Sequence, residues 1–166
     1  MPKEEVIIKD AKIKYRGTFD LALLYKSLTM WYGNSSYGAS LKEIKYVEKV
    51  RPDGKQIEIV WELNKEEESG YFKIEQGIKF YITKLNEAEV EKDGQRIKLD
   101  KCDLELTFGS KVIINANKSW NENSFIFKIY ERYFIGYRVE EIKIAAYKDT
   151  NKIMDEVKNF LNLYRF

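Results

Sequence analysis

The stretch that decides the fold is "FKIEQGIKFYI", which runs from Phe72 to Ile82. Its apolar residues recur at every second position, as the two faces of a half-buried β-strand require. We expect it to be the longest strand of a sheet. Gln76 is the exception on the apolar face, where it places an amide. Gly77, on the opposite face, predicts a bulge or bend that lets the strand curl.

Further strands are predicted on both sides of this stretch. The same alternation occurs at residues 11–16, 41–50, 57–63, 88–90, 97–99, 104–108 and 112–116. Two turn sequences, "RPDGK" (51–55) and "EKDGQ" (91–95), are typical of tight hairpins because Gly supplies a positive φ. A Gly-Ser turn is expected at 109–110. The middle of the chain therefore predicts a series of antiparallel hairpins.

A helix is predicted directly after the first strand. Apolar residues recur at helical spacing at positions 21, 24, 25, 28, 31 and 32. Asp20 is expected to cap the helix by accepting bonds from its first free amides. Gly33 is expected to take the left-handed conformation just beyond its end. Trp31 and Tyr32, in "TMWYGNSSYG" (29–38), share the leucine stripe and should pack on the sheet.

From Ser124 onward the apolar residues again recur at the spacing of a helix. The segment "SFIFKIYERYF" (124–134) is apolar around most of its circumference. Such a helix is either buried on two sides or contacts a partner. The tail, 139–164, is also helical by pattern. Two arrangements stay open there, a separate helix capped by Asp149 and Thr150, or one helix running from about Arg138 with Asp149 interrupting its apolar seam.

These elements predict an α+β fold in a single domain, residues 1–166. We expect a curved antiparallel sheet of about six to seven strands, packed against an N-terminal helix and one or two C-terminal helices. This element order resembles the START-like (SRPBCC) superfamily, whose helix-grip fold lays a long C-terminal helix on a curved sheet. The chain departs from it in having one early helix and an extra aromatic helix. The resemblance implies a space between sheet and helices that is either filled or holds a ligand.

A second resemblance concerns the C-terminal half of the chain. The stretches "AEVEKDGQRIKLDKCDLELTF" (88–108) and "IYERYFIG" (129–136), with Trp120 between them, resemble a group of small archaeal proteins of unknown function. That group implies no activity, cofactor or catalytic residue. A charged fraction of 34% without His is typical of proteins from thermophiles.

The composition narrows the classes of function. Lys and Arg number 29 against 27 Asp and Glu, so the net charge of +2 gives no large field to attract nucleic acid or anionic lipid. His is absent and Cys102 is the single cysteine, which removes the commonest general base and any cysteine-based metal site. No nucleotide-binding or nucleophile motif occurs. We therefore expect no cofactor and no metal, and we favour a binding module over an enzyme.

The location is expected to be the cytoplasm. The first ten residues, "MPKEEVIIKD", contain no apolar segment of the kind that a signal peptide needs. The sequence also has no apolar stretch long enough to span a membrane.

The first function we predict is the binding of a small apolar ligand between sheet and helices. Aromatic residues are concentrated on the first helix and the sheet, and a buried Gln needs hydrogen-bond partners that a ligand, water or backbone can supply. A filled aromatic core is the alternative. The candidate ligand-binding residues are Tyr25, Trp31, Tyr32, Trp61, Gln76 and Tyr81.

Two other functions stay open. Tyr130, Phe134 and Tyr137 of the 124–137 helix are candidate contacts for a homodimer or another protein, because Tyr and Phe are common at interfaces. Burial beneath the last helix is the other interpretation of these side chains. The third function is weak nucleic-acid binding through the lysines of the 42–55 hairpin and Tyr46, although Glu43 and Glu48 interrupt them.

Overall fold

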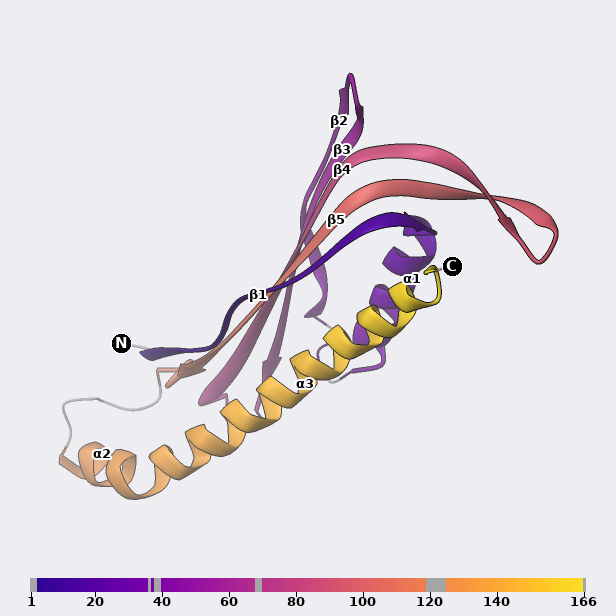
Figure 1. Cartoon of the computed structure of the whole chain (residues 1–166). Coiled ribbons are helices and arrows are strands. Elements are labelled where there is room, and N and C mark those ends of the chain that lie inside the picture. Colours follow the sequence, from indigo (N-terminus) through magenta and orange to yellow (C-terminus); the bar gives the residue numbers. More distant parts are fainter. Residues whose placement is uncertain (1–2, 36, 38–39, 68–69, 119–124, 166) are drawn as a thin grey trace.

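The computed structural model contains one sheet with its helices on one side (Figure 1). It describes residues 3–35, 37, 40–67, 70–118 and 125–165. Within these ranges five antiparallel strands form an open sheet in the order β1-β5-β4-β3-β2. Their bounds are β1 Lys3–Phe19, β2 Lys42–Arg51, β3 Gly54–Glu66, β4 Phe72–Lys92 and β5 Gln95–Ile114.

The helices follow β1 and β5. They are α1 Leu21–Gly33, α2 Phe125–Tyr130, the π-helical segment η2 Glu131–Ile135, and α3 Gly136–Asn162. Figure 1 shows α3 running diagonally across the sheet, with α1 beside its C-terminal half and α2 beyond the other end. None of the helices in the described part of the chain is both long enough and apolar enough to cross a bilayer.

The sheet has fewer strands than the sequence predicts, because five expected strands merge into two. Residues 72–82 and 88–90 both belong to β4, and residues 97–99, 104–108 and 112–114 all belong to β5. Lys84 has a φ of 55° next to a register shift, and this irregularity bends β4 without ending it. The prediction of six to seven strands is therefore corrected to five.

The glycines of the sheet behave differently from one another. Gly77 pairs in regular register with Glu62 and Gly109, so the predicted bulge at Gly77 and the predicted turn at 109–110 are both wrong. The turn predicted at 91–95 is confirmed. Asp93 and Gly94 have φ values of 53° and 76°, as a two-residue turn between twisted strands requires.

The start of α1 follows the prediction and its end does not. Asp20 caps the helix, because its Oδ1 accepts a hydrogen bond from the Leu23 amide at 3.0 Å. Gly33 is the last helical residue rather than the left-handed residue after it. Asn34 follows with right-handed torsions of −85° and −6°, and its amide bonds to the Met30 carbonyl.

The C-terminal segment forms one helix through Asp149 and Thr150, which decides between the two arrangements left open above. Thr150 is buried in the middle of α3, where its hydroxyl donates to the Ala146 carbonyl at 3.1 Å. It therefore continues a helix instead of capping a new one.

The core lies between the helices and the inner face of the sheet. Even-numbered residues at 72–82 of β4 and at 102–114 of β5, and odd-numbered residues at 57–63 of β3, point inward, as strand alternation requires. Leu24, Leu28 and Tyr32 of α1 and one stripe of α3 cover them. The outer face carries ion pairs such as Lys45–Glu58 at 2.7 Å. The architecture is thus an α+β fold with its helices on one face.

Candidate functional site

The six residues predicted to hold a ligand lie in three places. Trp31, Tyr32 and Gln76 line a single cavity between α1, β4 and α3. Tyr25 and Trp61 pack against each other farther along the sheet, with ring centroids 5.2 Å apart. Tyr81 lies on the outer face, since its neighbours Phe80 and Ile82 point into the core.

The first of these places is a cavity of about 360 Å³, which we call the Tyr32 cavity. Its size falls within the range of small-molecule sites, roughly 300–1,000 Å³. Its walls are the end of α1 with the residues after it, one position of β4, and one side of α3. The lining residues are Trp31, Tyr32, Asn34, Ser35, Tyr37, Gln76, Asp149, Lys152, Ile153 and Glu156.

The floor of the cavity contains polar side chains inside an apolar core. Gln76 is 4% exposed, and its Nε2 donates to the Thr150 hydroxyl at 3.1 Å. Ser110 of β5 is the register partner of Gln76 and is also buried. Among the described residues no group bonds to the Ser110 hydroxyl. Gln76, the predicted exception on the apolar face of β4, therefore belongs to a buried polar cluster that also includes Thr150 of α3.

The Tyr32 hydroxyl is the most unusual group of the cavity. The residue is 1% exposed, and no group in the described part of the chain bonds to its hydroxyl oxygen. Burial raises the pKa of Tyr32 well above its usual range, so the hydroxyl keeps its proton. A buried hydroxyl without a partner costs about 1–3 kcal/mol of stability. Such a group in a native protein requires an explanation.

The rim of the cavity is acidic. The hydroxyl of the buried Tyr37 donates to Asp149 Oδ2 at 3.4 Å. Burial, with a smaller contribution from the Asp149 carboxylate, raises the pKa of Tyr37. Glu156 adds a second carboxylate one helical turn beyond Lys152. The rim therefore presents two carboxylates and one ammonium group to a ligand.

A second and more apolar groove lies beside Tyr25. It measures about 630 Å³ and lies between α1 and strands β2 to β4. The Tyr25 hydroxyl donates to Glu43 Oε1 at 2.8 Å, and the Trp61 indole donates to the same oxygen at 3.3 Å. Burial and Glu43 raise the pKa of Tyr25 to about 12. Because these polar groups already have protein partners, this groove does not require a ligand to satisfy them.

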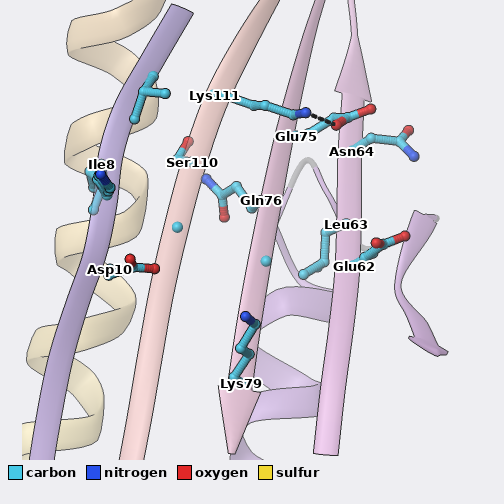
Figure 2. Close-up of a pocket in the computed structure, with 14 residues that line it drawn as sticks. Ile8, Asp10, Glu62, Leu63, Asn64, Glu75, Gln76, Lys79, Ser110 and Lys111 are labelled. Carbon is cyan, nitrogen blue, oxygen red and sulfur yellow. Dashed lines mark ion pairs between the residues drawn. The ribbon is translucent and has the colours of Figure 1, made fainter. Parts of the chain in front are cut away.

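A hollow of about 690 Å³ lies on the outer face of the sheet and spans four strands (Figure 2). Gly77 and Gly109 leave its floor without side chains. Lys111 pairs with Glu75 at 3.3 Å (Figure 2). It also pairs with Glu4 at 3.1 Å, so opposite charges neutralise each other around the hollow. We interpret it as a solvated face of the sheet.

The helix predicted to be an interface presents its aromatic residues to solvent. Phe127 and Ile135 are buried and attach the segment to the domain. The rings of Tyr130 and Phe134 stack at 5.5 Å. We call the exposed set the aromatic face; its members are 40–76% exposed and comprise Phe125, Ile126, Ile129, Tyr130, Tyr133, Phe134 and Tyr137.

The remaining candidate groups show no arrangement for chemistry. In the described ranges no three Cys, Asp or Glu side chains gather as metal ligands would. Burial, followed by Asp100 and Asp103, raises the pKa of the Cys102 thiol to about 12, which makes it unreactive. On the 42–55 hairpin, Lys55 pairs with Glu48 at 3.2 Å, which reduces the positive charge available to nucleic acid.

Sequence comparison identifies no relative. No family model matches the chain, and no curated protein matches it. A solved structure of a putative uncharacterized protein from Rhizobium leguminosarum is 11% identical and covers 98% of each chain, with a TM-score of 0.27. A likeness of that size carries no argument about function. The resemblances to archaeal proteins and to the START-like superfamily therefore stay predictions.

Proposed function

We propose that the protein binds a small molecule in the Tyr32 cavity. The observation that carries this proposal is the buried hydroxyl of Tyr32, a residue of the cavity lining, which has no partner among the described residues. A ligand atom that accepts a hydrogen bond would satisfy it. The Tyr25 groove supplies no such unsatisfied group, so we place the ligand in the smaller cavity.

The lining of the cavity defines the chemistry of the ligand. Its volume equals that of about twelve water molecules, at roughly 30 Å³ each. Trp31 and Ile153 form an apolar wall, whereas Tyr32 and Gln76 provide polar atoms at the floor. The carboxylates at the rim disfavour an anion. The ligand is therefore small and mostly apolar, with one polar group and no negative charge.

The test uses four probes of similar size, indole, phenol, benzylamine and benzoate, together with native mass spectrometry of the purified protein. A bound probe at 100 times its Kd stabilises the fold by about 2.7 kcal/mol. For a chain of this length that raises the Tm by roughly 5–10 °C. We expect the neutral and cationic probes to raise the Tm and benzoate to leave it unchanged.

Two variants locate the site. Trp31→Ala removes the apolar wall and Tyr32→Phe removes the hydroxyl, so both are expected to weaken binding of the probes about tenfold or more. Tyr25→Phe is the matched control, because it removes a hydroxyl from the other groove. Binding that Tyr25→Phe abolishes and Tyr32→Phe leaves intact would move the site to that groove. No shift with any probe, and no retained mass, would contradict the proposal.

A further inference from the structure

The aromatic face is too large to be ordinary protein surface. The exposed fractions of its seven residues amount to about four whole residues, and at roughly 200 Å² each this is about 800 Å². The largest apolar patch on a typical monomer is only about 300–600 Å². An apolar surface of this size marks an interaction site.

The fold holds this surface in a defined position. Phe127 and Ile135 anchor the segment in the core, and Arg138 ties the start of α3 to Glu67 in the β3–β4 connection. The π-helical turn η2 contains Phe134, and such turns occur frequently at functional sites. Figure 1 shows α2 beyond the edge of the sheet, where a partner can approach it.

We propose that the aromatic face binds a second copy of this chain, with the two aromatic faces packed on each other about a twofold axis. The area supports a dimer, since a standard stable interface buries about 800 Å² on each partner. A twofold interface uses the same surface on both copies and needs no second surface elsewhere on the molecule.

A lipid surface fits the same face less well. Attraction to anionic lipid requires free basic residues, each worth about 1 kcal/mol near the surface. Arg138 is already paired with Glu67 and Glu141, so few cations are left beside the face. Three of its seven members are tyrosines, which are enriched in protein interfaces.

The experiment measures the mass of the full chain by analytical ultracentrifugation over a range of concentrations. We expect a dimer that Phe134→Glu converts to a monomer, because the substitution places a carboxylate in the apolar interface on each copy. The expected weakening of the dimer is at least about 30-fold. Leu163→Glu is the matched control, since Leu163 is 70% exposed at the other end of α3. It should leave the dimer unchanged.

A monomer at all concentrations would overturn the proposal, as would a dimer that Phe134→Glu leaves intact. Sedimentation of the monomer with phosphatidylserine vesicles would assign the face to lipid instead. None of these outcomes depends on the Tyr32 cavity.

Discussion

Removing a single oxygen atom, by Tyr32→Phe, tests the main structural argument for a ligand. The hydroxyl of Tyr32 has no partner in the described part of the chain, and the residue is 1% exposed. Folding therefore removes the hydroxyl from water without a replacement, at a cost of about 1–3 kcal/mol. Phe keeps the ring that packs beside Leu28 and avoids this cost. We expect the variant to be more stable than the wild type by about 1 kcal/mol in the absence of ligand.

The matched variant, Tyr25→Phe, should change stability in the opposite direction. The Tyr25 hydroxyl donates to the Glu43 carboxylate at 2.8 Å, and that bond disappears with the hydroxyl. The pair is partly exposed to solvent, so the loss is about 0.5–1 kcal/mol, which is less than for a buried charged bond. Both substitutions remove a tyrosine hydroxyl from α1. The expected changes in stability have opposite signs because the Tyr25 hydroxyl has a hydrogen-bond partner and the Tyr32 hydroxyl has none in the described part of the chain.

Urea unfolding followed by tryptophan fluorescence measures both effects. The slope m should be unchanged in either variant, so the midpoints report stability directly. Thermal midpoints should differ from wild type by roughly 2–4 °C per kcal/mol. A loss of 1 kcal/mol or more in Tyr32→Phe would refute the reasoning, because the hydroxyl would then have a partner in the folded protein.

Three further predictions concern the rest of the fold. Cys102 should resist alkylation at pH 8 in the native protein and react on unfolding, because burial raises its pKa to about 12; rapid native labelling would contradict this. Lys143→Met should lower the free energy of unfolding by about 0.5 kcal/mol at pH 7, because it removes the ion pair with Glu5. Glu5 has a lowered pKa in the folded state, so this contribution is full above pH 4.5 and disappears as the pH falls through that lowered value; a cost that persists at pH 2 would contradict it. Gly54→Ala should lower the free energy of unfolding by about 2 kcal/mol, since φ is 136° and a Cβ would lie 2.8 Å from the Lys84 backbone. Gly77→Ala should change the urea midpoint little, because its Cβ would meet the Trp61 carbonyl oxygen at 3.9 Å, an ordinary van der Waals distance.

The parts of the fold that depend on local periodicity could be predicted from the sequence. The alternation from Phe72 to Ile82 placed Gln76 on the inner face, where the structure has it. The helical stripe placed Tyr32 with the leucines, and Asp20 was found as the cap. Each of these depends on residues that are neighbours in sequence, so the pattern alone carries the information.

The number of strands could not be predicted in the same way. A β-bulge and a turn both interrupt alternation, and the sequence around Lys84 does not distinguish them. Pairing along the whole length of β4 and β5 decides in favour of a bulge. Gly109 was interpreted as a turn residue for the same reason, although its role is to leave a strand without a side chain opposite Gly77.

The candidate site was predicted only in part. Trp31, Tyr32 and Gln76 converge on one cavity, while Tyr25 lines the separate groove. The opposite wall, on α3, was missed. The signal for it was Asp149, which interrupts the apolar seam of the last helix at the point where that helix meets Gln76. Gln76 interrupts the apolar face of β4, and Asp149 interrupts the apolar stripe of α3. Two such interruptions indicate a polar contact when the two surfaces pack on each other, but only the tertiary structure shows that they do.

The two proposed sites lie on one helix, and their independence can itself be tested. Phe134 and Asp149 are fifteen residues apart, which corresponds to about 22 Å along a helix. Substitutions separated by more than about 10 Å without shared partners usually act additively. We therefore expect Phe134→Glu to leave the probe-induced rise in Tm unchanged, and Tyr32→Phe to leave the dimer unchanged. If either substitution altered the other property severalfold, the two sites would be coupled. We would then expect α3 to move as a rigid unit over the sheet, since its buried Thr150 bonds to Gln76 while its Tyr137 belongs to the aromatic face.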